Sequence, residues 1–299
     1  MPKKTTSKSK SNKKSLMIFL VFLLMVSGAY GIFYYWKEYR NDPVATFNAA
    51  INNSLRTPSV NREVVQESQG QLLEQDIEVT FNPTHTARGF TEIVQPAQNT
   101  SVKTESITTP AEEYVRYISI DAGEEDGKFS DLIDVWAKTP PSAAEGSLGN
   151  LYGEAVLGVV PYANLPGHER KELTNFIREN GVYDYDSDKV QRKIVDGRPV
   201  YTYEVTVKPV PYIGMLKKFA EFYGLTQYES LNPGDYEGTQ AVTIELKVDA
   251  WARHITAINY QDGSRNERVS GYGSFLRPEL PQDYISLQEL QKRLQEVQE

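Results

Sequence analysis

The sequence contains no cysteine, and this absence excludes several kinds of site at once. Without thiols the chain forms no disulfide, binds no metal through thiolate and offers no cysteine nucleophile. It also has no cysteine for the lipid modification that tethers lipoproteins to a membrane. The folded part must therefore be stable through an ordinary apolar core, and 39% hydrophobic residues in a chain of 299 is enough to build one.

Histidine is scarce, and the common catalytic motifs are missing. His85, His168 and His254 lie far apart in the sequence and form neither an H-x-x-x-H nor an HExxH pattern. There is also no G-x-S-x-G nucleophile elbow, no G-x-x-x-x-G-K-[ST] phosphate loop and no G-x-G-x-x-G fingerprint. We therefore predict no catalytic residue, no metal site and no cofactor, and interpret the chain as a protein that is not an enzyme. A hydrolase whose acids or histidines converge only in the fold is the enzymatic alternative.

Two acidic clusters are the best candidates for cation binding. Asp184, Asp186 and Asp188 have the alternate spacing of an EF-hand loop, but Lys189 and Val195 stand where that loop requires glycine and glutamate. The other cluster is the DAGEED run at 121–126. We interpret both clusters as solvated loops, and the sequence leaves metal binding by the first loop undecided.

One long segment has no charged residue. It runs from Ser15 to Trp36, and a helix with about 1.5 Å per residue would make it roughly 33 Å long, enough for a hydrocarbon core of ~30 Å. The preceding residues contain six lysines and no acid, and lysine beside a membrane span stays on the cytoplasmic side. We therefore predict a basic cytoplasmic tail at 1–14, a transmembrane signal-anchor at 15–36 and a juxtamembrane linker at 37–42.

A cleaved signal peptide is the alternative for the same segment. Residues 16–26 would form its apolar region, and Ser-Gly-Ala at 27–29 would be the small-residue cleavage site. The apolar run continues past this site to Phe33, which favours an uncleaved anchor. Both interpretations place the rest of the chain outside the cytoplasm. We predict a single-pass protein of the cell membrane with an extracytoplasmic C-terminal domain.

Basic residues are concentrated before residue 41, and the rest of the chain is acidic. Residues 1–40 carry eight Lys or Arg and one acid, which leaves 24 basic and 39 acidic residues, a net charge of about −15, for residues 41–299. An acidic surface repels nucleic acid and anionic headgroups. We therefore exclude DNA and RNA as partners, and interpret the basic tail as a determinant of membrane orientation.

Short extended segments and amphipathic helices alternate in the domain after the anchor. Asp42-Pro43 is typical of an N-cap followed by proline in the first turn, and the apolar spacing after it predicts a helix ending near Pro58. Asp196-Gly197 between two extended runs predicts a tight hairpin within 190–208. The other strands expected from alternating patterns are 77–81, 90–94, 102–108, 114–120, 242–248, 254–260 and 267–275. The other helices expected are 152–160, 166–180 and 212–223.

Two segments in the second half of the chain carry a resemblance to known proteins. They are RKIVDGRPVYTYEVTV at 192–207 and VTIELKVDAWARHITAINYQDGSRNERVSGYG at 242–273. Together with the order of the expected elements over residues 42–280, they resemble the LolA and LppX/LprG group of cell-envelope proteins. The resemblance implies an α+β fold, a strongly curved antiparallel sheet (an unclosed half β-barrel) with helices on its concave face, preceded here by one transmembrane helix. It also implies a lipid or lipoprotein ligand whose acyl chains occupy the cavity.

These observations predict a LolA/LppX-like domain at 43–284 and an amphipathic helix at 285–299, which begins with a capping box at Ser286. The function predicted is a membrane-anchored, non-catalytic binding protein for a lipid, an acylated protein or another apolar ligand. The residues expected to line its cavity are apolar ones on three stripes: Phe47, Ile51, Tyr201, Tyr203, Leu216, Phe219 and Tyr223.

The alternative is a structural or protein–protein interaction module of the cell envelope with a filled, ligand-free core. In this alternative the helix at 212–223 fills the cavity. The acidic surface and the Leu287/Leu290/Leu294 stripe would then dock another envelope protein.

Overall fold

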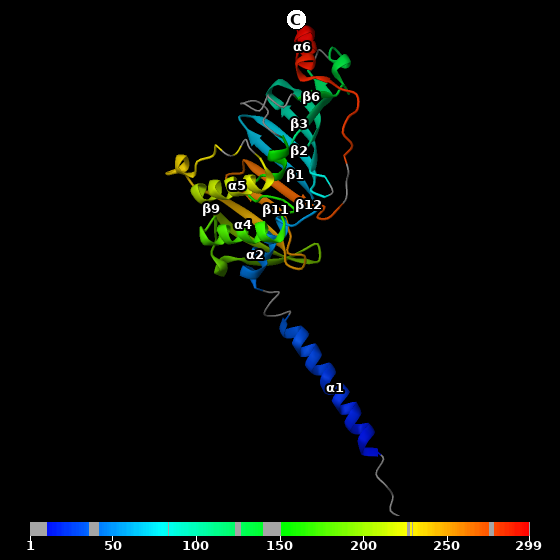
Figure 1. Ribbon diagram of the computed structural model, residues 1–299, viewed down its shortest axis with the longest axis vertical. Helices are drawn as coiled ribbons and strands as arrows, with labels where there is room; N and C mark the ends of the chain where they lie inside the picture. Colours follow the sequence, from blue (N-terminus) through cyan, green and yellow to red (C-terminus); the bar gives the residue numbers. More distant parts are fainter. Residues whose placement is uncertain are drawn as a thin grey trace, which may run out of the picture.

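The computed structural model describes residues 11–35, 42–82, 84–122, 127–139, 151–225, 228, 230–274 and 278–298. Helix α1, Ser11–Tyr34, stands apart from the rest of the described chain (Figure 1). It contains most of the segment predicted as an anchor, and its described side chains, from Val21 on, are all exposed. Among the residues that are described in full, no helix is both long enough and apolar enough to cross a membrane. This finding does not support the predicted signal-anchor, which stays a prediction.

A single large sheet forms the rest of the molecule. Thirteen strands of the described chain belong to it, in the spatial order β13-β6-β5-β4-β3-β2-β1-β12-β11-β10-β9-β7, with β8 also paired to β9. The strands of its first half are β1 (Ser59–Ser68), β2 (Gln71–Thr80), β3 (Thr86–Gln95), β4 (Thr100–Thr108), β5 (Glu113–Asp121) and β6 (Ala137–Thr139). The others are β7 (Tyr183–Asp184), β8 (Gln191–Val195), β9 (Arg198–Val207), β10 (Val242–Asp249), β11 (Ile255–Tyr260), β12 (Arg265–Ser270) and β13 (Ile285–Ser286).

The sheet is curved and unclosed, as the sequence predicts, but it is not purely antiparallel. Its neighbouring strands are antiparallel except for β13 and β6, which run parallel with Ile285 opposite Ala137. The sheet is therefore mixed, which corrects the predicted antiparallel one. Strands β1 to β5 lie between β12 and β6 in the sheet, so the chain passes these five strands after β12 before β13 pairs with β6.

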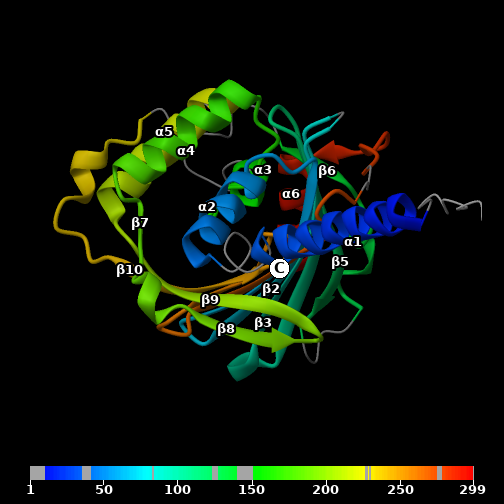
Figure 2. The same ribbon diagram turned by 90° about the horizontal axis from the view of Figure 1, so that it is seen from below.

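Helices cover the concave face of this sheet at one end (Figure 2). They are α2 (Pro43–Ser54), α3 (Leu151–Val156), α4 (Gly167–Glu179) and α5 (Pro209–Tyr223). A sixth helix, α6 (Leu287–Gln298), lies at the opposite end of the sheet beside β6 (Figure 1). The fold class predicted, α+β with helices on the concave face, is confirmed in this coarse form.

Local signals explain several of these elements. The Asp42 carboxylate accepts hydrogen bonds from the backbone N–H groups of Val44 and Ala45, at 2.8 and 3.2 Å, and so caps α2. The turn between β8 and β9 has positive φ at Asp196 and Gly197, 50° and 75°, which is the geometry that a two-residue hairpin requires. The N-cap of α2 and the hairpin were both predicted from the sequence.

Several elements differ from the prediction, among them α5 and β1. The helix expected from residue 212 begins three residues earlier, at Pro209. Proline suits the first turn of a helix, where a backbone N–H has no partner within the helix. Strand β1 was not predicted at all. Its inward positions include Arg62, a charged residue in a row that an alternating pattern would fill with apolar side chains.

The buried apolar residues form two separate clusters. The larger one packs α2 to α5 against the concave face of β1, β2 and β9 to β12. The smaller one lies beneath α6 and contains Phe129, Leu132, Ala137 and Leu290. The stretch of concave face between the two clusters, on β2, β3 and β4, is where the candidate site lies.

Candidate functional site

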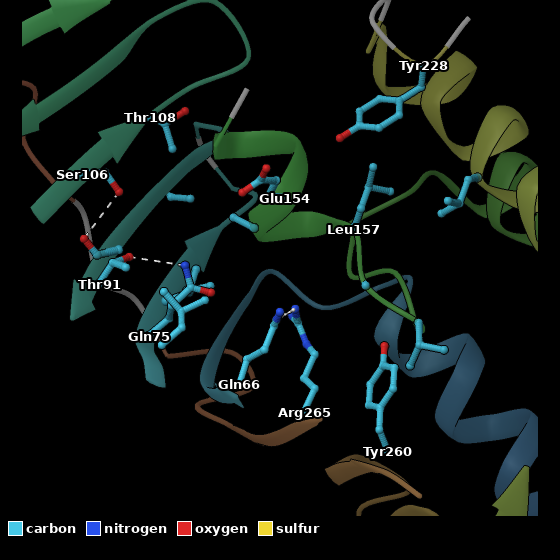
Figure 3. A pocket seen from close by; sticks show the side chains of 18 of the residues that line it. Gln66, Gln75, Thr91, Ser106, Thr108, Glu154, Leu157, Tyr228, Tyr260 and Arg265 are labelled. Atoms are coloured by element: carbon cyan, nitrogen blue, oxygen red, sulfur yellow. Dashed lines mark hydrogen bonds between the residues drawn. The ribbon is translucent and has the colours of Figure 1, made fainter. Parts of the chain in front are cut away.

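A cavity of about 450 Å³ opens on the concave face of β2, β3 and β4 (Figure 3). The sheet supplies its floor, α3 and the turn after it supply one wall, and α5 supplies Tyr212 and Leu216. Ligand pockets for small molecules typically measure 300 to 1,000 Å³, so the volume suits a small amphiphile.

The floor is deep because its side chains are small. Ala87 and Gly89 on β3 face the cavity beside Ser106 and Thr108 on β4. A Cβ atom at Gly89 would lie 3.0 Å from the Ser106 hydroxyl oxygen, so the glycine allows close packing of the two strands at this point. Larger residues at these positions would fill the space, and the cavity therefore follows from the sequence of β3 and β4.

The walls of the cavity are of mixed polarity. Apolar contact area comes from α3, α5, β2 and the turn after α3, and the residues that provide it are Leu73, Ile77, Ala155, Leu157, Val159 and Leu216. Polar groups gather at the other side (Figure 3), where Gln75 donates to the Thr91 hydroxyl at 3.3 Å and Arg265 donates to the Gln66 side-chain oxygen at 3.1 Å. An apolar wall with a few fixed polar groups is the usual composition of a ligand site.

A buried ion network ties the floor of the cavity to α3. Arg62 and Glu267 are 0 and 1% exposed, and Arg62 Nη2 lies 2.8 Å from Glu267 Oε2. The other guanidinium nitrogen, Nη1, donates to the carbonyl of Ala155 at 2.7 Å, near the end of α3. Arg265 Nε donates to Glu267 Oε1 at 2.8 Å. Since carbonyl groups at a helix end lack partners within the helix, Arg62 fixes the position of α3 over the sheet.

Glu154 on α3 lies at the rim of the same cavity (Figure 3). Burial raises the pKa of its carboxyl, and the positive charge of Arg265 offsets only part of that effect. Among the described residues no hydrogen bond or ion pair reaches this carboxylate. Glu154 is therefore an acid with a raised pKa beside a cavity and is available to a ligand.

The structure places the seven predicted lining residues mostly elsewhere. Leu216 alone among them lines the cavity. Phe47, Tyr201 and Tyr203 pack together with ring centroids 5.3 and 6.1 Å apart, and Ile51 is 4% exposed in the same core.

The remaining two predicted residues form a separate aromatic group. Phe219 and Tyr223 stack at 4.9 Å, and His85 lies 5.2 Å from the Tyr223 ring. Burial lowers the pKa of this histidine. Neither ring borders the cavity, so six of the seven residues expected to line a ligand site lie outside this cavity.

The residues that do line the cavity carried a weak signal in the sequence. Thr91, Ser106 and Thr108 are inward residues of strands β3 and β4, at positions where a core strand would have larger apolar side chains. A run of small residues on inward positions of neighbouring strands marks a place where the sheet has nothing packed on it. That signal depends on strand register, which a single sequence does not provide.

A second hollow of about 570 Å³ lies on the outer face of β8 to β11. Its lining includes the long charged side chains of Lys193, Glu204 and Lys247, and its apolar residues are limited to Val195 and Val200. Although its volume is larger, it is lined by fewer apolar side chains than the concave cavity. The concave cavity is therefore the better candidate for an apolar ligand.

The first acidic loop is held by lysines. Asp184 pairs with Lys208 at 2.9 Å, Asp186 pairs with Lys189 at 3.5 Å, and the Asp186 carboxylate also caps the backbone N–H of Asp188. In the part of the chain that the structure describes, no group of three or more His, Asp or Glu side chains is arranged to hold a metal ion. Of the second acidic cluster, residues 123–126 lie outside the described residues.

The chain resembles a solved structure only distantly. No protein-family model matches it, and no curated protein matches it either. Among solved structures it is similar to LprF from Mycobacterium bovis, with 14% sequence identity and a TM-score of 0.40, over 79% of this chain and 95% of LprF. LprF belongs to the LppX/LprG group, so the distant resemblance predicted from the sequence is confirmed. A likeness at this distance transfers no ligand, and the function must rest on the site's own geometry.

Proposed function

We propose that this chain is a non-catalytic binding protein for a lipid, an acylated protein or another apolar ligand, anchored in the cell membrane with its large domain outside the cytoplasm. The observation that carries the proposal is the cavity of about 450 Å³ on the concave face, with an apolar wall and a polar edge. Burying an acyl chain there removes apolar surface from water, at about 25 cal/mol per Å². The polar edge would orient the head of the ligand.

The experiment that tests binding compares two tryptophan variants of the full chain. Ser106→Trp places a large ring in the cavity, whereas Ser119→Trp places the same ring on the exposed surface of neighbouring β5. Each protein is expressed with membranes present, purified and analysed by native mass spectrometry and solvent extraction.

We expect a discrete lipid mass with the wild type and with Ser119→Trp, and its loss with Ser106→Trp. Thermal unfolding of all three proteins checks that the folds are equal. A wild type that carries no lipid and takes none up from added vesicles would contradict the proposal, as would a Ser106→Trp protein that keeps its lipid.

The proposed anchorage rests on the sequence, namely the uncharged run at 15–36 and the six lysines before it. Alkaline extraction of membranes from expressing cells tests it, since an integral protein stays in the pellet and a peripheral one does not. Protease added to intact spheroplasts should digest the large domain and spare the N-terminal tail. Release of the intact chain into the alkaline supernatant would refute the anchor.

An interaction module with a ligand-free core is the second candidate, and one observation favours it. Six of the seven predicted lining residues are packed against one another or against other core side chains. The docking surface in that case is not the stripe on α6, because Leu290 is 3% exposed in the smaller core cluster and Leu287 and Leu294 pack against the same cluster. A stoichiometric protein partner on co-purification, together with a lipid-free wild type, would favour this candidate.

A further inference from the structure

We propose that the head of the ligand carries one negative charge, a carboxylate or a phosphodiester, and that Arg265 pairs with it at the polar edge of the cavity. This inference rests on the proposed function and adds the chemical class of the ligand. It is carried by the charges and contacts that surround the cavity.

The first step is the charge of the buried network. Two guanidinium groups, those of Arg62 and Arg265, share the single carboxylate of Glu267, each through a contact of 2.8 Å. Guanidinium groups stay protonated at neutral pH, and the ionised form of Glu267 is held by both. The three side chains together therefore carry one net positive charge. Arg62 and Glu267 are fully buried and pair with each other, so the excess positive charge is that of the partly exposed Arg265, and it favours an anion nearby.

The second step is which of the two cations can reach a ligand. Arg62 is fully buried, and its Nη atoms are directed at Glu267 and at the carbonyls of α3. The side chain of Arg265 is 26% exposed and lines the cavity. Its Nε donates to Glu267 and its Nη1 donates to Gln66, while within the described part of the chain no hydrogen bond engages Nη2. Arg265 is therefore the cation that a ligand can meet.

The third step concerns the other acid of the cavity. Among the described residues that line the cavity, Glu154 supplies the carboxylate. Its oxygens are not within 4.0 Å of the guanidinium nitrogens of Arg265, so the two side chains form no ion pair. Burial raises the pKa of the Glu154 carboxyl and the positive charge of Arg265 opposes this effect, so the two groups interact at long range without direct contact. Glu154 thus gives Arg265 no close counter-ion, and as an anion it would repel an anionic head. Replacing Glu154 by glutamine should strengthen binding of such a head.

The apolar part of the ligand has a defined place relative to Arg265. Leu73, Leu157 and Leu216 line the cavity together with the guanidinium group, so an acyl chain can contact them while its head stays at Arg265. The residues 41–299 carry a net charge of about −15, which opposes an anion at long range. Salt screens such long-range repulsion, whereas a contact with a partly buried cation is screened much less.

The test measures competition for the cavity on the full chain. A photoreactive fatty alcohol with a diazirine in its chain labels the protein, and the labelled peptides are mapped by mass spectrometry. Unlabelled dodecanoate competes with it and is compared with 1-dodecanol, which has the same chain and no charge. Lysophosphatidylglycerol and a monoacylglycerol form a second pair, which distinguishes a phosphodiester from a carboxylate.

We expect at least one anion to compete about 10-fold or more better than its uncharged counterpart, since a hydrogen-bonded charge pair has roughly that effect. Arg265→Gln should abolish the preference and leave competition by the alcohol unchanged. Glu154→Gln, which removes no hydrogen bond or ion pair of the side chain among the described residues, should increase the preference about 3-fold or more. Arg192→Gln and Glu204→Gln, on exposed strand positions away from the cavity, are the matched controls and should behave as wild type.

Equal competition by the anions and their uncharged counterparts would overturn the inference and leave the proposed function intact. An unchanged preference in Glu154→Gln would also overturn it, and this variant keeps the test decisive even if Arg265→Gln fails to fold. Labelling that avoids β2 to β4 and α3 altogether would instead overturn the proposed function.

Discussion

Arg62 Nη2 lies 2.8 Å from Glu267 Oε2, and the two side chains are 0 and 1% exposed although both are charged. They come from β1 and β12, strands that are neighbours in the sheet and lie 205 residues apart in the sequence. The pair connects the first and the last long strands of the domain and, through the carbonyl of Ala155, the helix that walls the cavity.

Arg62→Met should destabilise the protein by about 3 to 5 kcal/mol, because it leaves a buried carboxylate with one cation fewer. It should also release the end of α3, since the carbonyl of Ala155 loses its donor. Chemical unfolding of the full chain measures the first effect, and amide exchange in α3 measures the second. Arg192→Met, at an exposed position, is the control. A loss below about 1 kcal/mol would show that the network contributes little to stability.

The ionisation of Glu267 makes stability depend on pH. Burial alone would raise the pKa of this carboxyl, but the charges and hydrogen bonds of Arg62 and Arg265 outweigh burial and lower the pKa below its ordinary value of 4.5. A lowered folded-state pKa stabilises the folded protein fully above the unfolded pKa, and this stabilisation is lost as the pH falls through the folded value. The unfolding free energy of the wild type should therefore fall between about pH 5 and pH 2.

Glu267→Gln isolates that contribution. The variant should be less stable than the wild type at pH 7, and the difference between the two proteins should shrink as the pH falls below 4.5. Urea unfolding at a series of pH values measures the difference. A gap that stays constant from pH 7 to pH 3 would mean that Glu267 does not titrate with folding.

A substitution at Phe219 tests whether this predicted lining residue belongs to the core or contacts the ligand. The ring is 0% exposed and stacks on Tyr223, away from the cavity. Phe219→Leu should reduce the unfolding free energy by about 1 to 2 kcal/mol and leave ligand affinity unchanged. Leu157→Ala, in the cavity wall, should weaken ligand binding with a smaller loss of stability, because Leu157 is only half-buried. The reverse result would restore the lining residues that the sequence predicts.

Leu290 tests whether α6 belongs to the domain. It is 3% exposed between α6 and β6, and Leu290→Ala should cost about 2 to 4 kcal/mol. Leu280→Ala, at a residue that is 39% exposed, should cost less than about 0.5 kcal/mol. The comparison is made by thermal unfolding of the full chain. Equal melting temperatures for both variants would indicate a helix free to dock a partner.

Much of the fold can be predicted from the sequence because its signals are local. The N-cap at Asp42 and the hairpin turn at Asp196 each need only neighbouring residues, and each has the predicted geometry. The curved, unclosed sheet was expected from a resemblance that also depends on the hairpin segments.

The site was harder to predict because its residues act across strands. In the sequence, the charge of Arg62 interrupts the apolar pattern expected of a buried strand. Only the fold shows that Glu267 lies beside it and forms a buried ion pair with it. Similarly, Phe47 and Tyr203 are apolar enough for a ligand and also for a core, and only their contact at 5.3 Å decides for the core. The cavity lies where inward positions lack large side chains. A search for apolar residues in the sequence instead finds the positions where large side chains fill the core.

The two core clusters lie under different parts of the sheet, and the local stability of the sheet should therefore differ along it. Its two ends are held by packed helices, whereas the stretch of β3 and β4 under the cavity contributes only Ala87 to the two core clusters. Local opening costs least where few apolar contacts must be broken. The amide hydrogens of Thr91 and Ser106 should therefore exchange with solvent faster than those of β9 and β10, and an occupied cavity should slow them. The exchange rates of these amide hydrogens would therefore show whether a ligand occupies the cavity.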